Sequence, residues 1–140
     1  MNTKFFAAIF FAAAAGVTTS GCEKKYEDGP LISLRSKKDR VANTWIVEKA
    51  YDENGDDVTN EYERYELRLT KDGDAELRAT YFGATFDTEG TWSFRSNKNN
   101  IFLDFENNSA DRNYEILRLK NDEFWLQKTD GSKELHLEPK

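Results

Sequence analysis

Two side chains in this sequence have the chemistry of a nucleophile and a general base, and they stand far apart. Cys22 is the only cysteine and His136 is the only histidine. A catalytic thiol needs a base beside it, and the alternation Leu135-His136-Leu137 predicts that the histidine faces solvent. The sequence has no glycine-rich phosphate loop and no metal-ligand cluster of histidine and cysteine. We therefore expect no enzyme activity and no cofactor.

An acidic segment over residues 52–63 offers a second kind of chemistry, the binding of a calcium ion. Its oxygen-bearing side chains occupy positions 1, 3, 5, 9 and 12, as in an EF-hand loop. Asp57 stands at the sixth position, where that loop needs glycine, and the flanking segments have the pattern of strands. A solvated acidic turn is the competing interpretation. The candidate metal ligands are Asp52, Asn54, Asp56, Asn60 and Glu63.

The N-terminal residues have the parts of a secretory signal. Lys4 precedes an apolar run over residues 5–17, which is shorter than the ~20 residues that a membrane-spanning helix needs. Ser20-Gly21-Cys22 resembles the lipobox of bacterial lipoproteins, in the permissive form of Bacteroidota-type proteins that accepts Thr19. The resemblance implies cleavage before Cys22 and lipid attachment to its thiol, which anchors the chain stably when more than one acyl chain is present. The expected location is the cell envelope, at the periplasmic or the surface face of the outer membrane.

Composition sets the domain organisation and excludes one class of partner. We expect a signal peptide over 1–21, a charged flexible tether over 22–30 and one folded domain over 31–140. The net charge is −6, and loss of Lys4 with the signal peptide makes the chain more acidic. Nucleic acid is excluded as a partner, because phosphate binding needs a basic surface. Aromatic residues make up 14% of the chain, which indicates a true hydrophobic core.

Apolar and polar residues alternate along most of this domain, and the alternation predicts strands. A capping pattern from Ser36 to Asp39 first predicts a short helix over roughly 34–42. Asp72-Gly73 between two alternating runs is a strong hairpin signal. The apolar phase slips between Ile116 and Leu117, which indicates a β-bulge. The expected strands cover residues 44–51, 65–70, 75–81, 85–94, 101–105, 113–119, 124–127 and 133–137.

Short turns between these strands make consecutive strands antiparallel neighbours. Closure of the sheet removes its two exposed edges, so we expect an all-β fold, an eight-stranded antiparallel up-and-down barrel with a short N-terminal helix. A two-sheet β-sandwich is the alternative. Trp45 follows a helical turn, in Asn43-Thr44-Trp45, and Gly90-Thr91-Trp92-Ser93-Phe94 lies in the fourth expected strand. In these features the chain resembles the bacterial lipocalin-like lipoproteins over roughly residues 31–138, since lipocalins carry Gly-x-Trp at the first position and such small barrels often show a segment like the second.

The barrel interior decides between two functions. Eight strands enclose room either for packed side chains or for one small ligand, and both possibilities stay open. A filled barrel would favour a surface module that binds protein or glycan through its outward aromatics Phe82, Phe102 and Trp125. We expect a monomer whose partners are a membrane, through the lipid on Cys22, and a small apolar ligand. The candidate ligand-binding residues are Trp45, Tyr65, Leu67, Leu77, Tyr81, Phe86, Trp92, Phe94, Leu103 and Phe105.

Overall fold

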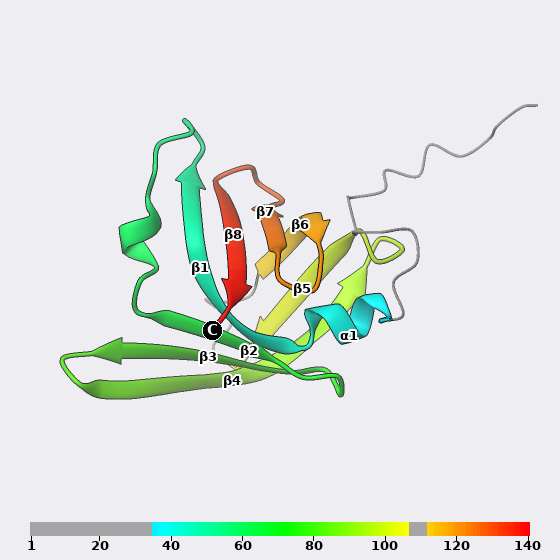
Figure 1. Cartoon of the computed structure of the whole chain (residues 1–140), viewed down its shortest axis with the longest axis horizontal. Coiled ribbons are helices and arrows are strands. Elements are labelled where there is room, and N and C mark those ends of the chain that lie inside the picture. The colour runs from blue at the N-terminus through cyan, green and yellow to red at the C-terminus, as the bar shows by residue number, and fades with distance from the viewer. Residues whose placement is uncertain (1–34, 107–111) are drawn as a thin grey trace, which may run out of the picture.

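The computed structural model describes residues 35–106 and 112–140, which form a closed barrel of eight antiparallel strands (Figure 1). The expected barrel is therefore confirmed, and the β-sandwich alternative is excluded. The expected signal peptide, the expected tether and Cys22 lie outside the described residues.

The strands follow one another around the barrel in the order of the chain. A short helix, α1 (Lys37–Val41), precedes them, and a 3-10 turn, η1 (Thr59–Glu61), lies between the first two strands. Figure 1 places α1 and η1 at opposite ends of the barrel. The strands are β1 (Asn43–Asp52), β2 (Tyr65–Leu69), β3 (Asp74–Tyr81), β4 (Ala84–Arg95), β5 (Asn100–Phe105), β6 (Arg112–Leu119), β7 (Phe124–Lys128) and β8 (Lys133–Pro139).

The first and last strands close the barrel. β1 pairs with β8 from Trp45, opposite Pro139, to Asp52, opposite Lys133. This pairing satisfies the backbone groups that an open sheet would expose at its two edges.

Two β-bulges interrupt the strand register. One lies in β6 between Ile116 and Arg118, which confirms the bulge indicated by the phase slip. The other lies in β1 between Val47 and Lys49. A bulge is visible in a sequence only where it interrupts an alternation of apolar and polar residues. Residues 45–47 are all apolar, so the sequence does not reveal the second bulge. Both bulges increase the local bend of the sheet, which helps it to curve into a barrel.

Helix α1 lies across one end of the barrel, which we call the closed end. The Ser36 hydroxyl accepts a hydrogen bond from the Asp39 backbone at 3.1 Å, and the Asp39 carboxylate accepts one from the Ser36 backbone at 3.3 Å. These reciprocal bonds satisfy donors that the first turn would otherwise leave free. Arg40 donates from Nη1 to the Leu119 carbonyl at 3.2 Å, which holds the helix against the end of β6. The closed end is thus fixed by hydrogen bonds as well as by packing.

Two buried tryptophans, Trp45 and Trp92, belong to the core, and Trp45 lies against α1. The rings of Trp45 and Phe124 pack with their centroids 5.4 Å apart, and both side chains are almost fully buried. The Trp45 indole nitrogen donates to the Val41 carbonyl at 2.8 Å, and the Trp92 indole nitrogen donates to the Thr70 carbonyl at 2.7 Å. Each indole therefore has a partner for its polar atom, which burial requires.

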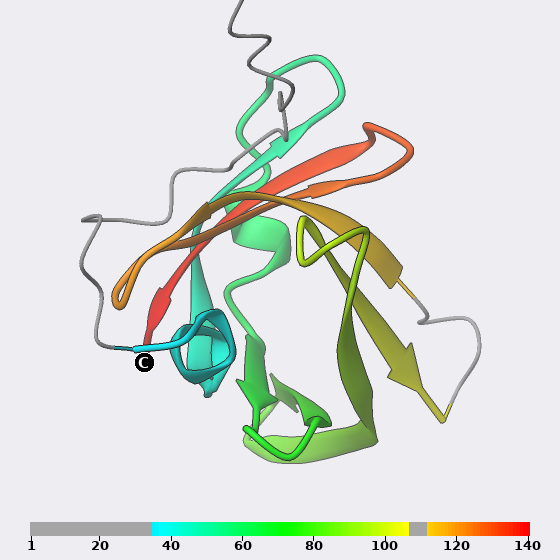
Figure 2. The same ribbon diagram turned by 90° about the vertical axis from the view of Figure 1, so that its right-hand side faces the viewer.

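The hairpin of β3 and β4 extends beyond the rest of the barrel on the side of η1 (Figure 1). β5 pairs with β4 only from Gly90 to Arg95, so the first half of β4 has only β3 as a neighbour. Figure 2, turned by 90°, shows β4 bending between its hairpin part and the part that joins the barrel wall. The outer part of this hairpin therefore contributes little to the barrel interior.

Candidate ligand-binding cavity

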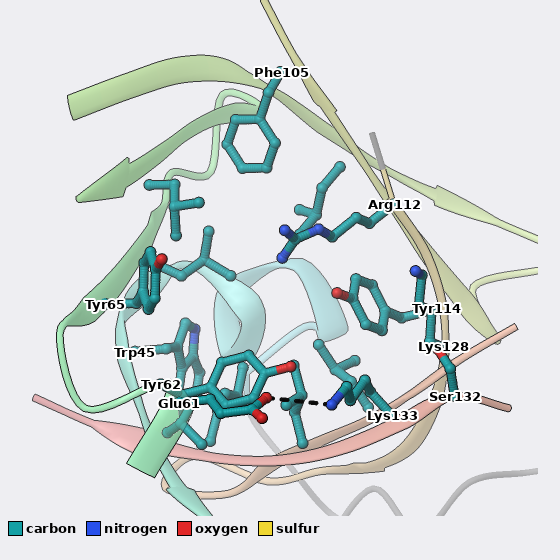
Figure 3. A pocket seen from close by; sticks show the side chains of 17 residues that line it. Trp45, Glu61, Tyr62, Tyr65, Phe105, Arg112, Tyr114, Lys128, Ser132 and Lys133 are labelled. Carbon is teal, nitrogen blue, oxygen red and sulfur yellow. Dashed lines mark hydrogen bonds and ion pairs between the residues drawn. The ribbon is translucent and has the colours of Figure 1, made fainter. Parts of the chain in front are cut away.

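A cavity of about 420 Å³ occupies the barrel between the closed end and η1 (Figure 3). Small-molecule sites commonly have volumes of about 300–1,000 Å³, so one small ligand fits. The cavity reaches the surface at Glu61, which is exposed. Its lining residues are Trp45, Val47, Glu61, Tyr62, Tyr65, Leu67, Leu77, Leu103, Phe105, Arg112, Tyr114, Leu126, Lys128, Ser132, Lys133, Leu135 and Leu137.

Strand register brings the apolar part of this lining together. Trp45 on β1 lies opposite Leu67 on β2, which in turn lies opposite Leu77 on β3. Residues directly opposite one another point to the same face of a sheet, so these three side chains form one continuous apolar wall. Leu126 on β7 and Leu135 on β8 are also paired and face the same space. An apolar ligand would therefore find apolar surface on both sides.

The polar part of the lining is mostly basic. Arg112, Lys128 and Lys133 contribute positive charge, and Glu61 contributes the only carboxylate among the lining residues. Lys133 binds Glu61, with 3.3 Å between its ammonium nitrogen and the carboxylate (Figure 3). The Lys128 ammonium lies 3.5 Å from Asp130, a residue outside the lining. The cavity thus carries excess positive charge in a protein whose net charge is −6.

Tyrosine hydroxyl groups complete the polar part. Tyr114 is only 4% exposed, and burial raises the pKa of its hydroxyl, although the nearby charge of Arg112 partly offsets this effect. The Tyr65 and Tyr81 hydroxyl oxygens lie 2.6 Å apart, and this hydrogen bond is the main reason why the pKa of Tyr65 is raised. The hydroxyl groups of Tyr114 and Tyr65 therefore stay protonated at neutral pH, so each carries a proton that it can donate in a hydrogen bond.

A second hollow of about 380 Å³ lies outside the barrel, over β1, β2 and β3. Its side chains are all polar or charged, and they include Arg68 and Glu76. This surface offers nothing to an apolar molecule, so the interior cavity is the better candidate.

The structure brings most of the predicted ligand-binding residues to the cavity. Trp92 and Phe94 do not line it. They pack against each other with their ring centroids 5.2 Å apart, and Trp92 belongs to the buried core. The predicted residues that do line the cavity are Trp45, Tyr65, Leu67, Leu77, Leu103 and Phe105.

Two predicted residues lie on the projecting hairpin instead. Phe86 is 60% exposed, so the expectation that it faces the barrel interior is wrong. Its phase along β4 is the inward one, but β5 does not extend alongside this part of β4, and no opposite wall covers the ring. Tyr81, at the end of β3, does not line the cavity itself and reaches it only through its hydrogen bond to Tyr65.

The acidic segment 52–63 does not assemble the expected calcium ligands Asp52, Asn54, Asp56, Asn60 and Glu63 into a metal site. Across residues 35–106 and 112–140, no group of three or more His, Cys, Asp or Glu side chains is placed to hold a metal ion. The Asp52 carboxylate accepts hydrogen bonds from the backbone of Asn54 at 2.9 Å and of Asp56 at 3.0 Å. It therefore acts as a turn-forming residue, which is the common role of aspartate in such loops.

Three basic lining residues were missed because they stand at the ends of strands. The sequence placed the start of the sixth strand at residue 113 and the end of the seventh at 127, which left Arg112 and Lys128 in turns. A signal was present, because each stands two residues from an inward apolar side chain: Arg112 from Tyr114, Lys128 from Leu126, and Lys133 from Leu135. Side chains two residues apart on a strand point to the same face of the sheet. This spacing predicts that the three basic side chains point inward, although they are charged.

Comparison with known proteins adds no family assignment. No family model, curated protein or solved structure matches this chain. Within the described parts of the chain, no helix combines the length and the apolar character needed to cross a membrane. The cavity and the residues that line it are therefore the features of the described chain that indicate a function.

Proposed function

We propose that this protein binds a small apolar molecule inside its barrel, as the resemblance to lipocalin-like lipoproteins implies. The observation that supports the proposal is the cavity of about 420 Å³, with leucine and aromatic side chains on facing walls. Burying an apolar ligand against such walls is favourable by about 25 cal/mol per Å² of apolar surface. A barrel filled by its own side chains would leave no such volume.

Methyl NMR of the full chain, titrated with decanol, tests this proposal. We expect resonances of Leu67, Leu77 and Leu103 to shift in a saturable way, because these side chains line the cavity. The buried methyl groups of Leu69 and Leu119 are the internal control, since neither residue lines the cavity. Absence of saturable shifts at the lining leucines, or equal shifts at the control leucines, would contradict the proposal.

We further propose that the chain is a lipoprotein held at the cell envelope by a lipid on Cys22. The support is the resemblance of residues 20–22 to a lipobox, after a short basic and apolar segment. In the source cell, Cys22→Ala is expected to move the protein from the membrane fraction to the soluble fraction or to leave it unprocessed and unlipidated. Mass spectrometry and fractionation measure both outcomes. A wild-type chain that carries no diacylglycerol on Cys22 would overturn the assignment.

A surface interaction module is the second candidate, because Phe82 is fully exposed at the tip of the β3–β4 hairpin. Phe82 has a φ of 50°, a left-handed conformation that costs a bulky residue roughly 1–2 kcal/mol. A strained, exposed aromatic favours a role in contact with a partner. The other two outward aromatics are covered: Trp125 stacks on His136 at 4.0 Å between centroids, and the Arg95 guanidinium lies 3.7 Å from the Phe102 ring centre.

A further inference from the structure

We propose that the molecule bound in the cavity carries one anionic oxygen head group, a carboxylate, which is bound by Arg112 beside the Tyr114 hydroxyl. This inference rests on the proposed function, and it narrows the ligand from any apolar molecule to an anionic amphiphile. Its basis is the position and the charge environment of Arg112.

Arg112 faces the inside of the barrel. It is the first residue of β6 and lies opposite Leu103, which is buried and lines the cavity. Tyr114 and Ile116, two and four residues further along β6, are also buried, and alternate residues of a strand share a face. Figure 3 shows the guanidinium group pointing into the cavity, toward the side of the Tyr114 hydroxyl.

Arg112 has no carboxylate partner within the described parts of the chain, whereas the other two basic lining residues each have one. Lys133 binds Glu61 at 3.3 Å, and Lys128 lies 3.5 Å from Asp130. The protein has 26 acidic residues, so an arginine on the surface would have many carboxylates with which to form an ion pair. A positive charge that is held inside a cavity and left unpaired is costly, and a bound anion would remove that cost.

The donor arrangement fits a carboxylate. An arginine guanidinium presents several N–H donors in a planar fork that matches the two oxygens of a carboxylate. The raised pKa of Tyr114 keeps its hydroxyl protonated, so it adds a donor rather than a second negative charge. A neutral head group would leave the arginine charge unpaired as the ligand excludes water, and a cationic head group would be repelled.

The leucine walls and the arginine together define an amphiphile with its tail toward the closed end. Leu67, Leu77 and Leu137 line the cavity together with Trp45, which is 1% exposed and whose indole nitrogen donates to the Val41 carbonyl of α1. Each methylene group buried there should increase affinity about fourfold. The head group then lies toward Arg112, the first residue of β6, whereas the last residue of that strand, Leu119, is held against α1 at the closed end.

Equilibrium dialysis of the purified full chain against decanoate, decanol and decyltrimethylammonium tests this inference. We expect decanoate to bind at least about tenfold more tightly than decanol, and decyltrimethylammonium to bind most weakly. Arg112→Met keeps the length of the side chain and removes the charge, so it should bind decanoate and decanol equally. Arg112→Lys should keep part of the preference for decanoate.

Arg68→Met is the matched control. Arg68 is exposed on the outer face of β2, between the inward Leu67 and Leu69, so this variant changes the net charge by the same amount outside the cavity. It should retain the full preference for decanoate. Arg112→Met should melt close to the wild type, because the lost hydrogen bond to Tyr114 is offset by removal of a charge that has no carboxylate partner among the described residues, and this establishes that the variant is folded.

The outcomes separate this inference from the proposed function. If neither decanoate nor decanol binds, the proposed function fails and the inference fails with it. If both bind the wild type with equal affinity, the cavity binds apolar ligands but the assignment of an anionic head group is wrong. If the preference survives in Arg112→Met, or disappears equally in Arg68→Met, the assignment to Arg112 is overturned.

Discussion

Gly90→Ala is expected to destabilise the barrel by about 3 kcal/mol or more, the upper end of the cost of overpacking a closely packed site. A Cβ atom at this position would collide with the carbonyl oxygen of Asp104 and lie 2.8 Å from the Cα atom of Phe105. Both obstacles are backbone atoms of the neighbouring strand, so no side chain can move to make room. Gly90 stands where β4 pairs with β3 and β5 at once, which is a position where only glycine allows such close approach.

Thermal or urea unfolding measures this effect, with an expected fall in melting temperature of roughly 10–20 °C. Gly55→Ala is the matched control, because Gly55 also has a special conformation, with φ of 80°, but a Cβ atom there would meet nothing within 4 Å. The free energy of unfolding of that variant should fall only by the cost of placing a residue with a side chain in a left-handed conformation, roughly 1–2 kcal/mol. Equal losses in the two variants would mean that β4 and β5 do not approach each other as closely as the structure has them.

Leu77→Trp is expected to block the cavity and lower the affinity for decanol about sixtyfold. Leu77 lines the cavity from β3, and a larger side chain there would extend into its volume. An indole that displaces about three methylene groups of the ligand, at ~0.8 kcal/mol each, removes about this much affinity. Since the indole fills empty space, the melting temperature of the free protein should stay the same or rise.

Leu69→Trp provides the comparison on a neighbouring strand. Leu69 is 2% exposed and does not line the cavity, so the same substitution forces extra volume into packed surroundings. It should cost about 1–3 kcal/mol of unfolding free energy. Calorimetric unfolding of both variants, followed by titration with decanol, measures the two effects. Loss of stability in Leu77→Trp as large as that in Leu69→Trp would show that no cavity is there to be filled.

The barrel could be predicted because its sequence pattern is local and repeated. Side chains with a period of two, separated by short turns, specify antiparallel neighbours, and the need to cover two sheet edges favours closure. The phase slip at Ile116 was visible for the same reason, since alternation exposes any insertion. The bulge after Val47 was not visible, because the apolar run over residues 45–47 contains no alternation.

The cavity was harder to predict because it depends on how far each strand extends and on which neighbour it has. Phe86 has the inward phase, but its part of β4 has no second neighbour, and sequence period carries no information on that point. The basic side chains Arg112, Lys128 and Lys133 lie at strand ends, where strand limits from sequence are least certain and charge suggests a turn. The apolar walls could thus be predicted from single strands, whereas the cavity volume and its positive charge arise only when all the strands are placed together.

Isothermal titration of the wild-type chain with decanol, at several temperatures, tests the central claim most directly. One ligand per chain should bind in a saturable way, with a negative heat-capacity change, which is the mark of apolar surface removed from water. Leu77→Trp should show little or no such binding under the same conditions. The absence of saturable heat in the wild type, or equal binding by wild type and Leu77→Trp, would contradict a ligand site inside the barrel.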